Sequence, residues 1–121
     1  MNKQHALVVD DDSYVRDATA RALRLRGFEV HTAMNGREAL DLLNKQEFVP
    51  VAIVSDHDMP LVSGSELYRL ICQVHPALEC RFILMTGNDR YKRFADEYAI
   101  PFLSKPFSNE QLDAAVKSVL P

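Results

Sequence analysis

The chain has 121 residues, of which 47% are hydrophobic and 26% are charged, and its formal net charge is -3 with a pI near 5.7. This size and apolar content predict one folded domain over residues 1–121 and exclude a disordered segment. The acidic balance is a poor match for a phosphate backbone, so we expect no nucleic-acid binding by this domain. No apolar run approaches the roughly 20 residues of a membrane helix, and the N-terminus lacks a signal-peptide pattern, so we expect a cytoplasmic protein.

Apolar runs alternate with segments of helical period along the chain. The predicted strands are 6–10 (ALVVD), 28–33 (FEVHTA), 51–56 (VAIVSD), 81–87 (RFILMTG) and 100–107 (IPFLSKPF). Apolar residues at helical spacing follow each strand, over residues 15–25, 39–43, 67–74, 91–98 and 112–119. Helix caps are predicted at Asp12 or Ser13, and at Ser108; the third helix should open at Ser63 or Gly64.

Strands that are apolar on both faces and alternate with helices are typical of a parallel sheet covered on both sides. Right-handed crossovers then predict an α/β fold, a doubly wound (βα)5 sandwich. Rossmann-like and flavodoxin-like variants are both compatible with this pattern. With five strands, the flavodoxin-like order 2-1-3-4-5 is favoured. The aromatic row at 91–98 would form the inner face of the fourth helix.

Polar side chains stand at the carboxyl ends of the predicted strands, where doubly wound sheets form their sites. They are Asp10, Asp11 and Asp12 after the first strand, Asp56 and Asp58 at the third, Thr86 at the fourth and Lys105 at the fifth. Clustered carboxylates repel one another, and oxygen ligands on a rigid frame suit Mg²⁺. A divalent ion, an ammonium group, a hydroxyl and a carboxylate that can accept a phosphoryl group together predict a phosphoryl-transfer site.

The ordered set LVVDDD, VAIVSDHDMP with Gly64, LMTG and FLSKPF resembles the receiver domain of bacterial two-component response regulators, over the whole chain. The resemblance implies that a sensor histidine kinase or a phosphotransfer protein donates a phosphoryl group to Asp56, with Mg²⁺ as the cofactor. It implies that Asp11 and Asp56 hold the metal directly, that Asp10 does so largely through water, and that the backbone carbonyl of Asp58 is a further ligand.

The resemblance also implies a conformational switch. Lys105 would pair with the phosphoryl group, and the Lys105–Pro106 bond would be cis. Thr86 would move to donate to the phosphoryl group, and Phe102, where tyrosine is frequent, would rotate inward. The surface of the fourth helix, fifth strand and fifth helix would change, and a homodimer through it is left open. Such a domain promotes its own phosphorylation and dephosphorylation but turns over no external substrate.

Two other functions fit part of the pattern. A phosphatase of the haloacid-dehalogenase kind would use Asp56-x-Asp58, with Asp56 as nucleophile and Asp58 as acid/base. That motif normally opens a longer chain, and it leaves Asp10 and Asp11 without a role. An FMN-binding flavodoxin-like module would need a hydroxyl- and glycine-rich phosphate loop after the first strand, where three aspartates stand instead.

We expect no role in the site for the cysteines and histidines. Cys72 and Cys80 lack metal-site spacing, so we expect two reduced thiols in or near the core. His57 should be a loop residue that points to solvent, because a Mg²⁺ site prefers oxygen ligands. The remaining histidines, His5, His31 and His75, are expected at the surface. The sequence identifies neither the kinase nor an output domain.

Overall fold

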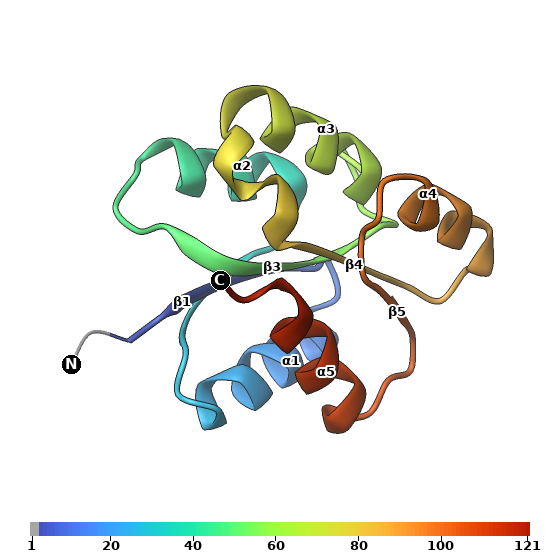
Figure 1. Cartoon of the computed structure of the whole chain (residues 1–121), viewed down its shortest axis with the longest axis horizontal. Helices are drawn as coiled ribbons and strands as arrows, with labels where there is room; N and C mark the ends of the chain where they lie inside the picture. The colour runs from blue at the N-terminus through green and yellow to red at the C-terminus, as the bar shows by residue number, and fades with distance from the viewer. Residues whose placement is uncertain (1–2) are drawn as a thin grey trace.

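The computed structural model describes residues 3–121 and consists of a central sheet between two groups of helices (Figure 1). The sheet has five parallel strands in the order β2-β1-β3-β4-β5. The strands are β1 (His5–Val9), β2 (Glu29–Ala33), β3 (Pro50–Asp56), β4 (Phe82–Thr86) and β5 (Phe102–Ser104). The predicted flavodoxin-like order is confirmed.

Helices cover both faces of the sheet. On one face lie α1 (Ser13–Leu25) and α5 (Asn109–Val119); on the other lie α2 (Gly36–Asn44), α3 (Gly64–Val74) and α4 (Lys92–Glu97) (Figure 1). Alternate residues of β1 serve the two cores: Leu7 packs on the α2–α3 side and Val8 on the α1–α5 side. Helices shield both faces of the sheet from solvent, which explains why the strands are continuously apolar.

The helices α1, α2, α3 and α5 begin at capping residues whose side chains satisfy free N–H groups. Asp12 caps α1 by accepting from the backbone N–H groups two and three residues further on, so Ser13 is already inside the helix. Of the two predicted alternatives there, Asp12 is correct. Ser63 caps α3 and Ser108 caps α5, each through a reciprocal capping box.

The fourth helical segment is shorter than predicted. A 3₁₀ turn, η2 (Asp89–Tyr91), precedes α4, which ends at Glu97 because Ala99 adopts a left-handed conformation with φ 56. Ala95 is buried and Phe94 half-buried, but Tyr98 is 43% exposed, so the aromatic row lies only partly on the inner face. A second 3₁₀ segment, η1 (Pro76–Arg81), joins α3 to β4 and was not predicted.

Gly64 brings the start of α3 against the end of β3. A Cβ at this position would lie 2.5 Å from the carbonyl oxygen of Asp56 and 2.8 Å from the Cα of His57. We expect Gly64→Ala to lower the free energy of unfolding in urea by about 2 kcal/mol, because backbone atoms must shift. Gly87→Ala is the matched control, since nothing lies within 4 Å of its Cβ. Equal stability of the two variants would contradict this packing.

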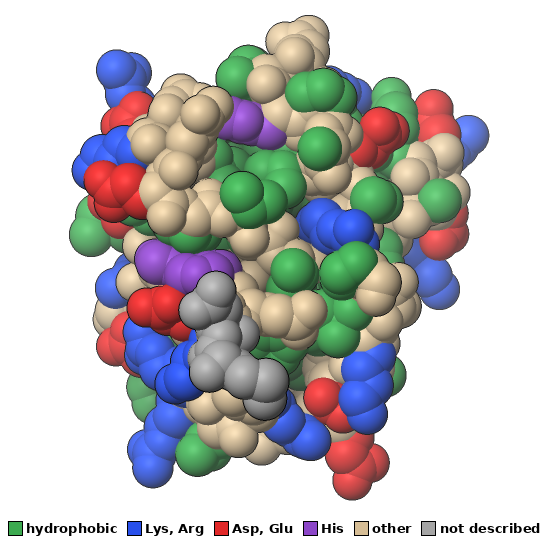
Figure 2. Space-filling model, turned by 60° about the vertical axis from the view of Figure 1, so that its left-hand side comes forward, with side chains coloured by type: hydrophobic (Ala, Val, Ile, Leu, Met, Phe, Trp, Pro, Cys, Tyr) green, Lys and Arg blue, Asp and Glu red, His purple; other side chains and the backbone are tan. Residues whose placement is uncertain are grey.

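Two histidines pair at the end of the sheet away from the strand carboxyl ends. His5 Nδ1 lies 2.9 Å from His31 Nε2, and His5 Nε2 lies 3.4 Å from a carboxylate oxygen of Glu29. The His31 ring stacks on Phe48 with centroids 3.6 Å apart. Figure 2 shows histidine side chains at the surface on this side of the molecule. Both rings are half-buried rather than fully exposed.

The two cysteines form no disulfide: Cys72 is half-buried and Cys80 is exposed. This agrees with the expectation of free thiols, although only Cys72 approaches the core. Within residues 3–121, no helix combines the length and the apolar character that crossing a membrane requires.

Candidate functional site

Three carboxylates meet at the carboxyl ends of β1 and β3. The register pairs Val9 with Ser55, so Asp10 and Asp56, the next residues on each strand, stand side by side. With Asp11 they place one carboxylate oxygen each within 4.8 Å of one another. Asp10 and Asp56 are buried, whereas Asp11 is exposed. An oxygen cluster that is rigid on one side and open on the other fits Mg²⁺, which retains several waters.

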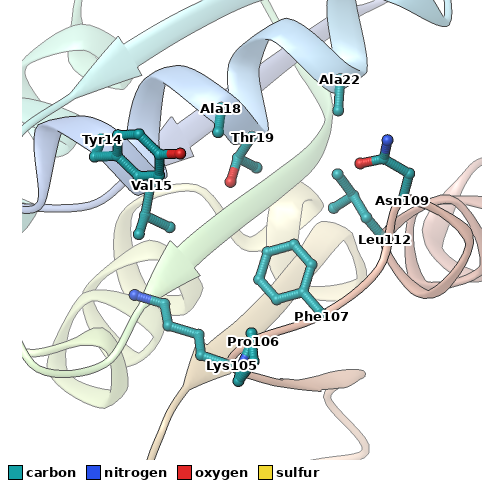
Figure 3. A pocket seen from close by; sticks show the side chains of 10 residues that line it. All are labelled: Tyr14, Val15, Ala18, Thr19, Ala22, Lys105, Pro106, Phe107, Asn109 and Leu112. Carbon is teal, nitrogen blue, oxygen red and sulfur yellow. The ribbon is translucent and has the colours of Figure 1, made fainter.

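Lys105 supplies the positive charge of the site. Its Nζ lies 2.9 Å from Asp10 Oδ2 and 3.1 Å from Asp56 Oδ1. The residue follows β5, where its backbone N–H donates to the carbonyl of Thr86 and its bond to Pro106 is cis. In Figure 3 the amine extends from this segment toward the carboxyl end of β3. The structure thus brings together residues that are 95 positions apart in the sequence.

The surroundings of Asp56 disfavour its ionised form. Burial and, after it, the charge of the neighbouring Asp10 raise the pKa of Asp56, while Lys105 opposes them, and the net result is a pKa of about 6. Burial by itself would lower the pKa of Lys105, but the hydrogen bond to Asp10 and the charge of Asp56 outweigh burial and raise it. The site therefore holds a firmly protonated lysine and a carboxylate whose ionised form a further cation would stabilise.

Both carboxylate oxygens and the backbone carbonyl of Asp10 accept hydrogen bonds from protein groups. Its Oδ1 accepts from the Asp12 N–H at 2.9 Å, and its Oδ2 accepts from Lys105. The Arg16 guanidinium donates to its backbone carbonyl at 3.1 Å. Arg16 was not predicted as a site residue, because nothing in the sequence shows that its side chain folds back over the preceding loop.

Thr86 and Phe102 occupy neighbouring strands. Thr86 is fully buried; its Oγ1 donates to Asp58 Oδ2 at 3.3 Å and accepts from the Asn88 N–H at 3.1 Å. Phe102 pairs with Leu84 in the ladder and is half-buried at the edge of the α2–α3 core. The two predicted switch residues are therefore on adjacent strands, with Thr86 nearer the carboxylates.

The prediction that His57 points to solvent is wrong. Its side chain is 6% exposed, and its ring centroid lies 3.5 Å from that of Tyr91. Its backbone continues the sheet, with its N–H donating to Met85 and its carbonyl accepting from Gly64, and this directs the ring inward. Burial lowers the pKa of His57. Its Nδ1 is the one buried side-chain nitrogen or oxygen without a partner among residues 3–121.

Protonation of Asp56 should compete with metal binding. We expect Mg²⁺ affinity to be full at neutral pH and to fall by up to about tenfold per unit as the pH drops below about 6. Calorimetric Mg²⁺ titrations between pH about 5 and about 8 measure this. Because the folded-state pKa is raised, the metal-free protein should also lose stability as the pH rises through about 6. An affinity that is independent of pH would show that Asp56 does not bind the ion.

The fold and the site together define a class of protein. A doubly wound sandwich of order 2-1-3-4-5, with an acidic cluster and a lysine at its strand ends, is the architecture of a phosphoryl-accepting signalling domain. A family model described as the response regulator receiver domain matches residues 6–117. The chain belongs to this family, the receiver domains of two-component response regulators.

Two curated relatives and one solved structure support this family assignment. The chain is 36% identical over 115 residues to the sensor kinase CckA of Brucella abortus, matching 94% of this chain and 12% of that protein. It is 38% identical over 117 residues to the response regulator MprA of Mycolicibacterium vanbaalenii, matching 94% of this chain and 49% of MprA. The chain thus spans about half the length of MprA. The response regulator TrrA of Thermotoga maritima, in complex with Mg²⁺-BeF, superposes with a TM-score of 0.84 at 28% identity, over 97% of this chain and 99% of TrrA.

Proposed function

We propose that Asp56 accepts a phosphoryl group from a sensor histidine kinase or a phosphotransfer protein, in a reaction that requires Mg²⁺. The observation that carries the proposal is the meeting of Asp10, Asp11 and Asp56 within 4.8 Å, with Lys105 Nζ 3.1 Å from Asp56. Asp11 and Asp56 would hold the ion directly, Asp10 largely through water, and the backbone carbonyl of Asp58 would complete the protein ligands. The Mg²⁺-BeF complex of TrrA supports this choice of ion.

In the proposed reaction Lys105 binds Asp56 Oδ1, which leaves Oδ2 to attack the phosphorus. A bond forms between this oxygen and phosphorus, while the bond from phosphorus to the donor's imidazole nitrogen breaks. The imidazole leaves with the electron pair. Bound Mg²⁺ supplies charge that offsets the phosphoryl oxygens and the carboxylates. Lys105 contributes a second positive charge, and the buried strand end holds Asp56 in position for in-line attack.

Phosphorylation would then change the conformation of one surface of the domain. The new group adds negative charge and strong acceptor oxygens, so Thr86 would move to donate to it and Phe102 would turn inward. The affected surface comprises α4, β5 and α5, where we place the proposed homodimer contact. The response is a shift between two populated conformations. Hydrolysis of the acyl phosphate in the same site would return the domain to its resting state.

The cellular setting follows from this proposal. We infer that residues 1–121 act as one receiver domain in the cytoplasm, where a kinase or phosphotransfer partner reaches Asp56. The similarity to part of CckA, which is named a sensor kinase, supports a partner in a two-component pathway. The net charge of -3 argues against nucleic-acid binding by this domain.

Acetyl phosphate and p-nitrophenyl phosphate separate this function from that of a haloacid-dehalogenase-like phosphatase. Incubation with acetyl phosphate and Mg²⁺ should add one phosphoryl group per chain, as measured by intact mass, and the label should decay after the donor is removed. Chelation of Mg²⁺ should prevent labelling. Sustained turnover of p-nitrophenyl phosphate would instead favour Asp56-x-Asp58 phosphatase chemistry. The place of Asp10 beside Asp56, bound to Lys105, already favours the receiver function.

A further inference from the structure

The donor capacity of the Thr86 hydroxyl is already used in the unphosphorylated protein. It donates its single proton to Asp58 Oδ2 at 3.3 Å and accepts from the Asn88 N–H at 3.1 Å. No hydrogen bond joins it to Asp56 within the part of the chain that the structure describes. A threonine hydroxyl has one proton to donate. The bond to Asp58 must therefore break before Thr86 can donate to a phosphoryl group.

The same contacts continue to the beginning of α4. Asn88 Oδ1 accepts from the Arg90 N–H at 3.1 Å and thereby caps η2. The last residue of η2 is Tyr91, whose ring lies on His57, and α4 starts at the next residue. A displacement of the Thr86 hydroxyl therefore disturbs the anchor of η2. The segment that leads into α4 is tied to the phosphorylation site through Asn88 and through His57.

We propose that the side chain of Asp58 is a resting-state latch that holds Thr86 in its unphosphorylated conformation and so opposes switching, an inference that rests on the proposed phosphorylation of Asp56. Asp58 is a positioning residue that acts through Thr86. Its carboxylate is exposed and the bond is long, so water competes for it and the latch is weak enough to open. A phosphoryl dianion nearby repels the carboxylate and competes for the same proton.

Two substitutions at Asp58 separate the hydrogen bond from the charge. Asp58→Ala removes both, whereas Asp58→Asn removes the charge and keeps an acceptor oxygen. We expect Asp58→Ala to bind beryllofluoride, in the presence of Mg²⁺, about three- to tenfold more tightly than the original chain, in an NMR titration of backbone amides. Asp58→Asn should lie between the two.

A double-mutant cycle with Thr86→Ala decides whether Asp58 acts through Thr86. Without the threonine hydroxyl there is no proton to hold, so Asp58→Ala should produce no further gain in beryllofluoride affinity. A gain that persists undiminished in the Thr86→Ala background would assign the effect to charge alone and overturn the latch. Wild-type affinity in the Asp58→Ala single variant would overturn it as well.

Spectra without Mg²⁺ and beryllofluoride test the latch independently of phosphorylation chemistry. In Asp58→Ala, the amide resonances of Gly87, Asn88 and Lys92 should move toward the positions that beryllofluoride produces in the original chain. Unchanged resonances would contradict the latch. If the original chain binds no beryllofluoride at all, the proposed function of Asp56 fails; if it binds beryllofluoride but the three resonances in Asp58→Ala do not move toward the bound positions, the latch alone is overturned.

Discussion

Asp56→Asn should abolish labelling by acetyl phosphate and Mg²⁺, as measured by intact mass. The amide of asparagine is a far weaker nucleophile than a carboxylate. Asp10, the other buried carboxylate beside Lys105, has both of its oxygens bound, one by the Asp12 N–H and one by Lys105. The fold should persist, because asparagine has the same shape and removes a carboxylate whose ionisation is disfavoured there. We expect this variant to be at least as stable as the original chain at neutral pH without metal.

Asp58→Asn is the matched control for that experiment, since it changes the same chemical group two residues away. It should still accept one phosphoryl group, because its proposed metal contact is a backbone carbonyl. Full labelling of Asp56→Asn, or loss of labelling only in Asp58→Asn, would move the acceptor away from Asp56.

Lys105→Met should impair both stability and phosphorylation. Methionine keeps much of the apolar stem but leaves Asp10, which is fully buried, without its cation. Because Lys105 is partly exposed, we expect a loss of about 2 kcal/mol in the free energy of unfolding without metal, below the value for a fully buried pair. The rate of labelling by acetyl phosphate should fall about a hundredfold, since one stabilising charge is lost from the transition state.

Mg²⁺ should partly rescue the stability of Lys105→Met, because a bound cation also relieves the repulsion between Asp10 and Asp56. Saturating Mg²⁺ should stabilise this variant by about 3 kcal/mol at a hundredfold excess over the dissociation constant. Urea unfolding with and without Mg²⁺ measures this change. A variant whose stability is unaffected by Mg²⁺ would contradict the shared placement of the lysine and the ion beside these carboxylates.

Much of the fold could be predicted because the evidence for it is local. Continuous apolar strands require cover on both faces, and five strand–helix units favour one strand order. The site followed from the fold: parallel strands end at one edge of the sheet, so Asp10, Asp56 and Lys105 had to lie near one another. The comparisons then confirmed the family that the ordered motifs resemble.

What escaped prediction depends on where single side chains point. His57 directs its ring inward because its backbone is still bound to β4, and a position after a strand end does not reveal that pairing. Ala99 ends α4 in a left-handed conformation that alanine rarely adopts, and Tyr98, just before it, is partly exposed. The Asp58–Thr86 contact joins the loop after β3 to the last residue of β4, and only the folded chain shows that the two approach each other.

We propose that the acids of two neighbouring strands bind Mg²⁺ together and that Asp56 takes the phosphoryl group, and one measurement tests both. Borohydride reduces an aspartyl phosphate to homoserine, so reduction after labelling, followed by peptide mass spectrometry, identifies the acceptor. We expect homoserine at position 56 alone, and only in samples that contained Mg²⁺. Homoserine at position 10, 11 or 58, or labelling that proceeds equally without Mg²⁺, would contradict it.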